Sequence, residues 1–225
     1  MIRVMIVDDE ILLRSCMQRI LESEADIEVP VACDGREVRE AVAAHRPDVV
    51  LLDLRMPEVD GLTALEWIRA HQDPPAVAVL TTFLRDEDIA AALRSGAAGF
   101  LLKDATPQEL ADAVRVLAAG GTVLSPAAAR IVVDGYLGAG PRHGERDPRL
   151  DTLTEREQQV LELLGEGLTN ADIGRRLLLS ASTAKEHVSS ILTKLGLANR
   201  VQAAVVAHRA AAEGHLRPSA LAETR

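Results

Sequence analysis

Aromatic side chains are scarce in this 225-residue sequence, which contains two Phe, one Trp and one Tyr although 48% of its residues are hydrophobic. Any core must therefore be aliphatic. The two cysteines, Cys16 and Cys33, have neither a metal-binding spacing nor a disulfide framework, which is typical of a reducing cytoplasm. No apolar run approaches the roughly 18 residues of a membrane span. Acidic residues follow the N-terminus too early for a signal peptide, so we expect a cytoplasmic protein that does not bind membranes.

Negative charge is concentrated in the first part of the chain. The formal net charge is −9, and residues 1–133 contain 13 Lys and Arg residues against 22 Asp and Glu residues. Residues 151–213 are nearly neutral, with 7 basic against 8 acidic residues. Net charge bears on steering and solubility rather than on fold, but this asymmetry indicates two separate units.

Short apolar runs alternate with amphipathic helical patterns in the first of these units. Five strand–helix repeats predict a parallel sheet covered on both faces, and thus a flavodoxin-like, doubly wound α/β domain with five strands. The expected strands are 3–7, 27–32, 49–54, 76–82 and 99–103, and the expected helices lie near 10–22, 36–45, 62–71, 87–95 and 107–119.

The second unit has purely helical periodicity, which predicts an all-α domain of four helices at 154–165, 170–178, 181–195 and 200–213. Between the two units, the Gly, Pro and charged residues at 138–149 predict a linker, and 125–137 could form a short helix that starts at Ser125 and Pro126. The predicted organisation is an α/β domain at 1–122, a linker at 123–150, a helical domain at 151–214 and a C-terminal tail at 215–225.

Polar residues stand at the ends of four predicted strands: Asp8 and Asp9, Asp53, Thr81 and Lys103. The carboxyl ends of parallel strands share one edge of a sheet, where ligands bind. Three neighbouring carboxylates favour a cation, and Mg²⁺ prefers oxygen ligands together with a phosphate. A carboxylate such as Asp53 can act as a nucleophile and become an aspartyl phosphate. The alternative is that these residues only cap the helices that follow.

Four segments around these positions, MIVDDE, LLDLRMPEVDG, VLTTF and GAAGFLLKD, resemble a bacterial two-component receiver domain. The resemblance covers about residues 1–120. It implies that Asp53 is the phosphoacceptor. It also implies that Mg²⁺ is held by Asp8, Asp9, Asp53 and the backbone carbonyl of Arg55.

The same resemblance implies a switch near the phosphoacceptor. Thr81 would be the hydroxyl that turns toward the phosphoryl group, Lys103 the phosphate-pairing lysine and Phe100 the switch aromatic. The alternative for Phe100 is ordinary packing, although we expect it near the rim of an exposed edge strand. Many receivers have proline after the lysine, where this sequence has Asp104, so the cis peptide bond usual at that position is not expected.

Residues 181–195 have one apolar and one polar face, with Ser180 as a candidate N-cap. The preceding TNADIGRRL predicts a second short helix. Two helices joined by a tight turn are the elements of a helix-turn-helix, whose second helix lies in the major groove of DNA. The alternative is a helical bundle with a solvated surface. The apolar stripe contains Ala184, Val188, Ile191, Leu192 and Leu195, and the polar face contains Lys185, Glu186, Ser189, Ser190 and Thr193.

The segment from LTEREQQVLELL through the last helix, about residues 151–213, resembles the LuxR-type output domain of NarL/FixJ-like response regulators. Because glutamate can accept a hydrogen bond from cytosine N4, Glu186 is a specificity reader, a partner of Lys185 or a solvated residue. The resemblance implies that Lys185, Glu186 and Ser189 meet base edges or the groove and that Thr183, Lys194 and Arg200 contact phosphates.

The two resemblances imply a phosphorylation-dependent transcriptional regulator, not an enzyme apart from self-phosphorylation and dephosphorylation at Asp53. The implied partners are a sensor histidine kinase, double-stranded promoter DNA and a second copy of the chain after phosphorylation, with RNA polymerase as a further candidate. A Mg²⁺-dependent phosphohydrolase is an alternative, but Arg55 stands where a second acid would be expected. A regulator that ignores phosphate is another. The last helix has a small-residue face suited either to dimerisation or to packing within its domain: Val201, Ala204, Val205 and His208.

Overall fold

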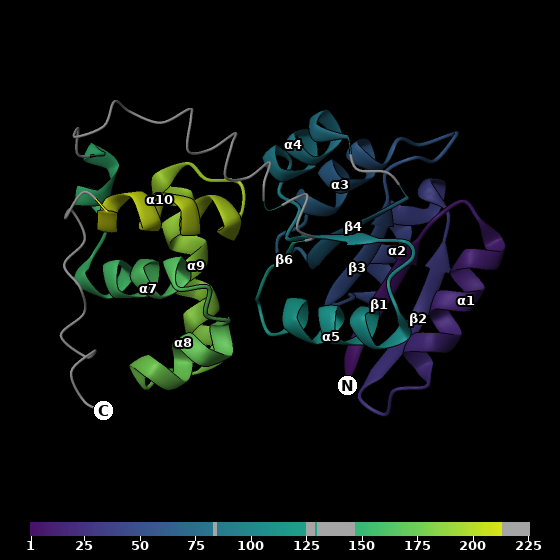
Figure 1. Ribbon diagram of the computed structural model, residues 1–225, viewed down its shortest axis with the longest axis horizontal. Helices are drawn as coiled ribbons and strands as arrows, with labels where there is room; N and C mark the ends of the chain where they lie inside the picture. Colours follow the sequence, from purple (N-terminus) through teal and green to yellow (C-terminus); the bar gives the residue numbers. More distant parts are fainter. Residues whose placement is uncertain (83–84, 125–128, 130–146, 213–225) are drawn as a thin grey trace. The chain divides into compact units, whose positions relative to one another are not determined.

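The computed structural model describes residues 1–82, 85–124, 129 and 147–212 (Figure 1). Contacts divide the chain into two compact units, one built on Met1–Ala118 and the other containing the helices that follow residue 147. Apart from residue 129, the predicted short helix at 125–137 lies outside the described residues, as do most of the predicted linker and the predicted tail at 215–225.

A parallel sheet with the strand order β2-β1-β3-β4-β5-β6 forms the first unit (Figure 1). The predicted parallel α/β fold is confirmed, with one strand more than expected. That strand, β6, lies at the start of the predicted linker and pairs with β5, as Gly99 with Val123 and Phe100 with Leu124. Its two residues are too few to show a strand period. The strands are β1 (Ile2–Val7), β2 (Ile27–Cys33), β3 (Val49–Asp53), β4 (Ala76–Thr81), β5 (Gly99–Leu102) and β6 (Val123–Leu124).

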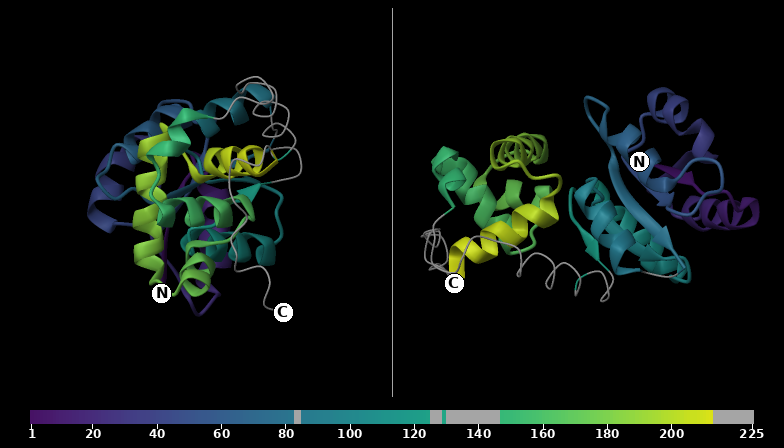
Figure 2. Two further views of the ribbon diagram at one scale, coloured as in Figure 1. Left: turned by 90° about the vertical axis from the view of Figure 1, so that its left-hand side faces the viewer. Right: turned by 90° about the horizontal axis from the view of Figure 1, so that it is seen from above.

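Helices cover both faces of this sheet (Figures 1 and 2). One face packs against α1 (Ile11–Glu22) and α5 (Pro107–Ala118) in a fully aliphatic cluster that includes Ile6, Leu51 and Val114. Every residue of β3 is buried, as expected for a central strand covered on both sides. The other face is covered by α2 (Val38–His45), α3 (Gly61–Arg69) and α4 (Asp86–Arg94), and η1 (Gly35–Glu37) directly precedes α2.

One glycine lets α3 begin directly against the end of β3. The amide of Gly61 donates to the carbonyl oxygen of Leu54 at 3.0 Å. A Cβ atom on Gly61 would overlap the carbonyl oxygen of Asp53, so only glycine permits this close approach. The packing fixes the backbone that carries the Asp53 side chain.

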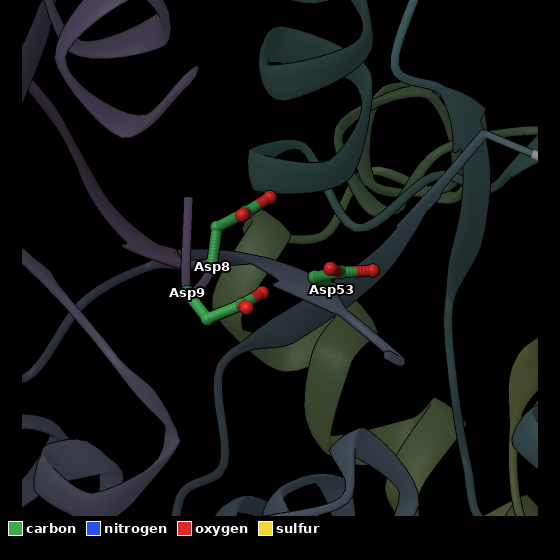
Figure 3. A group of neighbouring side chains, drawn as sticks. All are labelled: Asp8, Asp9 and Asp53. Atoms are coloured by element: carbon green, nitrogen blue, oxygen red, sulfur yellow. The ribbon is translucent and has the colours of Figure 1, made fainter. Parts of the chain in front are cut away.

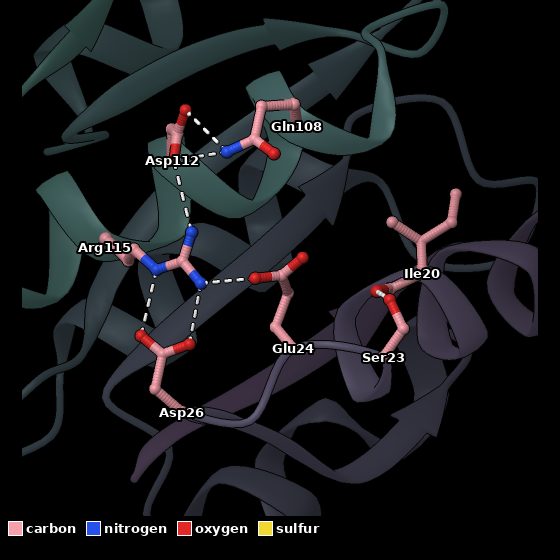
Figure 4. Close-up of polar contacts among 7 residues, drawn as sticks. All are labelled: Ile20, Ser23, Glu24, Asp26, Gln108, Asp112 and Arg115. Atoms are coloured by element: carbon pink, nitrogen blue, oxygen red, sulfur yellow. Dashed lines mark hydrogen bonds and ion pairs between the residues drawn. The ribbon is translucent and has the colours of Figure 1, made fainter.

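An arginine on α5 collects three carboxylates at the edge of the first unit (Figure 4). Arg115 forms a two-point contact with Asp26, at 2.7 and 2.9 Å, and also reaches Glu24 at 2.5 Å and Asp112 at 3.2 Å. The hydrogen bonds with Asp26 and Glu24 raise the pKa of Arg115 above its ordinary value. Since Glu24 and Asp26 lie between α1 and β2, the network connects α5 to that loop.

The second unit contains η2 (Pro148–Thr152), α7 (Glu155–Gly165), α8 (Asn170–Leu177), α9 (Ala181–Leu195) and α10 (Arg200–Ala212). The four predicted helices are confirmed to within one residue at each end. They enclose their own aliphatic core, and α10 packs on α7 (Figure 2). Each of α7, α8 and α9 begins at a hydroxyl residue that accepts a backbone hydrogen bond, namely Thr154, Thr169 and Ser180. Among the described residues, no helix is both long and apolar enough to span a membrane.

Candidate functional site

Three carboxylates gather at the carboxyl ends of β1 and β3 (Figure 3). Asp8 and Asp9 directly follow β1, and Asp53 is the last residue of β3. One carboxylate oxygen from each of the three lies within 4.8 Å of the others. Asp8 and Asp53 are buried, with Asp8 wholly inaccessible, whereas Asp9 is more exposed. The structure thus brings together the acids that the strand ends predicted, with one side open to solvent.

Lys103 balances part of this negative charge. Its ammonium lies 2.8 Å from Asp8 Oδ2, 2.9 Å from Asp53 Oδ2 and 3.6 Å from Glu10 Oε1. Burial disfavours the charged form of Lys103, but its contacts with the carboxylates of Asp8 and Asp53 outweigh this effect and leave its pKa raised. For Asp8, burial is the larger influence and raises its pKa, although the same lysine opposes the shift.

The carboxylate oxygens of this cluster are suitable ligands for Mg²⁺. Asp8 Oδ1 accepts from the amide of Glu10 at 2.9 Å, and Asp53 Oδ1 accepts from the amide of Arg55 at 3.2 Å. Asp8 Oδ2 is fully buried and, among the described residues, has an ion pair but no well-directed hydrogen bond. A buried carboxylate oxygen with unused acceptor capacity, beside two further carboxylates, fits a hard cation that prefers oxygen ligands. Asp8, Asp9 and Asp53 would hold the ion, with the Arg55 carbonyl as the fourth predicted ligand.

Thr81 and Phe100 occupy different environments. Thr81 is the buried last residue of β4, one position beyond Leu80, which pairs with Asp53, and its carbonyl accepts from the Lys103 amide at 3.0 Å. Phe100 is only 1% exposed and sits inside the sheet. The expectation that it lies on an exposed edge strand is wrong, because β6 covers β5 on that side. The peptide bond between Lys103 and Asp104 is trans.

The polar face of α9 is largely where the sequence predicted it. Lys185, Glu186 and Ser189 are exposed, opposite the buried Ala184, Val188, Ile191 and Leu195. Ser180 caps the helix, since its Oγ accepts from the Thr183 amide at 3.0 Å. The Thr183 hydroxyl lies 2.9 Å from the Ser180 hydroxyl.

Known proteins match both halves of the chain. Residues 4–115 match the family model described as response regulator receiver domain, and residues 151–207 match that of bacterial regulatory proteins of the luxR family. The transcriptional regulatory protein LiaR of Bacillus subtilis (strain 168) is 38% identical over 211 residues, which cover 93% of this chain and 98% of LiaR. The chain belongs to the NarL/FixJ-like family of response regulators.

Two further similar proteins support the assignment of this chain to the response regulator family. The nitrate/nitrite response regulator protein NarL of Escherichia coli (strain K12) is 37% identical, with 92% of this chain and 94% of that protein covered. The solved signal receiver domain of the putative response regulator NarL from Mycobacterium tuberculosis is 38% identical, with a TM-score of 0.51, and covers 53% of this chain and 97% of that one. The predicted two-component receiver and LuxR-type DNA-binding domain are therefore confirmed.

Two of the residues predicted to contact DNA phosphates bind partners within the second unit of the response regulator. Lys194 Nζ lies 2.6 Å from Glu157 Oε2. The Arg200 guanidinium donates to the carbonyl oxygen of Leu168 and to Asn170 Oδ1 at 3.3 Å, and burial lowers the pKa of Arg200 to about 10. The structure therefore gives Lys194 and Arg200 partners within their own domain, and their contact with DNA phosphates stays a prediction.

Ser190 also departs from the predicted polar face. It is half-buried, and its hydroxyl donates to Glu157 Oε1 at 2.5 Å. Glu157 was not among the predicted functional residues, although the Thr154-x-x-Glu157 spacing is that of a capping box. Burial favours the neutral form of Glu157, but hydrogen bonds from Lys194, Ser190 and Thr154 outweigh this and lower its pKa to about 2.

Glu157 should make the response regulator sensitive to acid. A carboxyl whose pKa is lowered on folding contributes stability above its ordinary pKa of 4.5, and this contribution is lost as the pH falls toward about 2. We expect Glu157→Gln to reduce the free energy of unfolding at neutral pH by on the order of 2 kcal/mol. The difference between wild type and variant should shrink from pH 4.5 downward. Urea denaturation followed by circular dichroism measures the two free energies of unfolding. A difference that does not change with pH would contradict the lowered pKa of Glu157.

Proposed function

We propose that this response regulator controls transcription through Mg²⁺-dependent phosphorylation of Asp53 by a sensor histidine kinase or a small phosphodonor. Phosphorylation would release the output domain and favour dimers on promoter DNA. One observation carries the proposal: Asp8, Asp9, Asp53 and Lys103 converge at the strand ends of a chain whose second unit presents a polar helix-turn-helix face.

The residues of the acidic cluster can divide the phosphorylation reaction among them. Asp53 is the nucleophile: its carboxylate oxygen forms a bond to phosphorus while the bond between phosphorus and the donor atom breaks. Bound Mg²⁺ would neutralise charge on the phosphoryl oxygens. Lys103, already 2.9 Å from Asp53 Oδ2, is placed to pair with the transferred group. Pairing with the phosphoryl group would draw Lys103 away from Asp8.

The phosphoryl group adds close to two negative charges, which supports a switch through Thr81. Thr81 ends the strand next to β3 and lies close in register to Asp53, so its hydroxyl is suited to turn toward a phosphorylated side chain. Phe100, two strands from β3 and fully buried, would then repack. A nearly complete switch requires about 5.5 kcal/mol of differential stabilisation.

The outer face of α10 supports dimerisation. Ala203, Ala207 and Ala210 of α10 are buried in the core of the second unit, and Val206 packs against it. Of the small-residue face predicted from the sequence, Val201 is buried, whereas Ala204 and Val205 are half-buried and His208 is exposed. We propose that Ala204, Val205 and His208 contribute to the dimer contact. A second copy would help a nearly neutral domain, which has little charge for phosphate contacts, to bind DNA.

The exposed polar face of α9 is proposed to lie in the major groove. Lys185→Ala should weaken binding to a preferred duplex by about 1–3 kcal/mol, because a base-edge contact is lost. Footprinting and titration after phosphodonor treatment measure this loss. Thr193→Ala is a suitable control, because Thr193 is exposed on the same helix and its hydroxyl donates to the backbone carbonyl oxygen of Ser189. An unchanged footprint for Lys185→Ala would contradict the proposal that α9 lies in the major groove.

A further inference from the structure

Three long side chains at the start of the second unit hold the helix-turn-helix. We call Arg149, Arg156 and Glu157 the polar clamp. Arg149 Nη1 donates to the carbonyl oxygen of Leu195 at 2.6 Å, where α9 ends. Arg156 Nη2 donates to the carbonyl oxygen of Leu177 at 2.5 Å, where α8 ends. Both guanidinium groups therefore satisfy carbonyl groups that a helix C-terminus leaves without intrahelical partners.

Within the polar clamp, Glu157 is the residue that accepts hydrogen bonds from side chains of α9. Its Oε1 accepts from Ser190 Oγ at 2.5 Å, and its Oε2 accepts from Lys194 Nζ at 2.6 Å. It also accepts from the backbone amide and hydroxyl of Thr154 at 2.8 and 3.0 Å, and only 4% of Glu157 is exposed. Ser190 and Lys194 are four residues apart and lie on one side of α9, so the carboxylate opposes rotation of α9 about its axis.

The rotation of α9 decides where its exposed side chains point. A side chain reaches about 6 Å from the helix axis, so a rotation of about 20° displaces its end by about 2 Å. Hydrogen bonds to base edges tolerate far smaller errors. Lys185, Glu186 and Ser189 belong to the same continuous helix as Ser190 and Lys194. Contacts at one side of α9 therefore set the geometry of its reading face.

We propose that Glu157 is the positioning residue of the DNA-reading helix. Through Ser190 and Lys194 it holds α9 in the rotation that discriminates between base sequences, and it keeps the charge of Lys194 away from DNA phosphates. This inference rests on the proposed function, because it assumes that α9 reads DNA. It assigns Lys194 to selectivity instead of phosphate binding.

Glu157→Gln separates an effect on the rotation of α9 from an effect on stability. It keeps the size of the side chain, but it is uncharged, so it no longer forms an ion pair with Lys194. Its single amide oxygen also cannot replace both the oxygen shared by Thr154 and Lys194 and the oxygen that accepts from Ser190. The Lys194 side chain, already 34% exposed, then turns to solvent and adds one positive charge that is available to phosphates. Binding to the preferred sequence weakens, whereas binding to unrelated DNA strengthens. Simple loss of folded protein would instead weaken both.

The experiment uses the full chain treated with a phosphodonor and two duplexes of equal length. One duplex is selected in vitro from random sequence by the wild type, and the other is unrelated. For Glu157→Gln, the ratio of the two affinities falls about tenfold or more, equivalent to about 1.4 kcal/mol. The salt dependence of non-specific binding steepens by about one unit of log K per log salt. Glu155→Gln, a change to an exposed residue on the same helical turn, leaves both quantities unchanged.

Two further variants keep the test independent of folding. Ser190→Ala removes one donor to Glu157 and lowers the selectivity ratio to a smaller extent. Glu157→Gln combined with Lys194→Met removes the released charge, so non-specific binding returns to the wild-type level while the preferred duplex still binds weakly. Circular dichroism establishes the folded fraction of each variant.

Equal selectivity in Glu157→Gln and the wild type would overturn the inference. A parallel loss of both affinities in Glu157→Gln and Ser190→Ala would also overturn it, because that result assigns Glu157 to stability alone. Lys194→Met that flattens the salt dependence by about one unit would place Lys194 on a phosphate, against the inference. Failure of the proposed function looks different: the wild type then selects no duplex, and the inference falls with it.

Discussion

Asp53→Asn is expected to abolish phosphoryl transfer to this response regulator completely. An amide oxygen is a far weaker nucleophile than a carboxylate, and Asp53 is the only carboxylate at the end of β3. The substitution is nearly isosteric, and Lys103 keeps its contact with Asp8 at 2.8 Å, so the fold should persist. Intact-protein mass spectrometry after incubation with a small phosphodonor and Mg²⁺ measures the added phosphoryl group.

Asp60→Asn is the matched control for this experiment. Asp60 is exposed and precedes α3, where its side chain makes no capping hydrogen bond, so phosphorylation should be unaffected. DNA binding by Asp53→Asn should no longer respond to the phosphodonor. Phosphoryl incorporation by Asp53→Asn would disprove the assignment of the phosphoacceptor. Promoter binding as strong as that of the phosphodonor-treated wild type would instead favour a regulator that ignores phosphate.

Removal of Mg²⁺ should slow phosphorylation by about a thousandfold or more, because a bound cation stabilises the charge of phosphoryl transfer by several kcal/mol. Chelation should produce this loss, and added Mg²⁺ should reverse it. Asp8→Asn should weaken Mg²⁺ binding itself, since Asp8 Oδ2 is the buried carboxylate oxygen with unused acceptor capacity. Isothermal titration calorimetry with Mg²⁺ alone measures that affinity without phosphorylation.

The same Asp60→Asn variant serves as the control for the metal experiment, since it removes a carboxylate outside the acidic cluster. It should bind Mg²⁺ as the wild type does. Unchanged Mg²⁺ affinity in Asp8→Asn would exclude Asp8 as a ligand. Undiminished phosphorylation after chelation would show that Lys103, which already pairs with Asp8 and Asp53, suffices to balance the charge.

The sequence alone determined the features that depend on local periodicity. The apolar run at 49–54 predicted a strand, and the structure has that strand as β3, buried throughout. The stripe from Ala184 to Leu195 predicted the extent of α9 without error. Because carboxyl ends of parallel strands share one edge, the positions of Asp8 and Asp53 were enough to predict their convergence.

Periodicity shows which face of an element is buried, but not which partner lies against it. The sixth strand was missed because two residues have no period, and with it the sequence could not show that Phe100 is enclosed on both sides. The charge of Lys194 was read as available for DNA. Its partner, Glu157, is 37 residues away in the chain.

Only the packing of α7 against α9 brings Glu157 to Lys194 and Ser190. Such a contact depends on the relative rotation of two helices, which the core side chains of both decide together. Local sequence therefore determined what α9 is and which residues it exposes. The tertiary structure decided which of its charges are already used and how firmly its reading face is held.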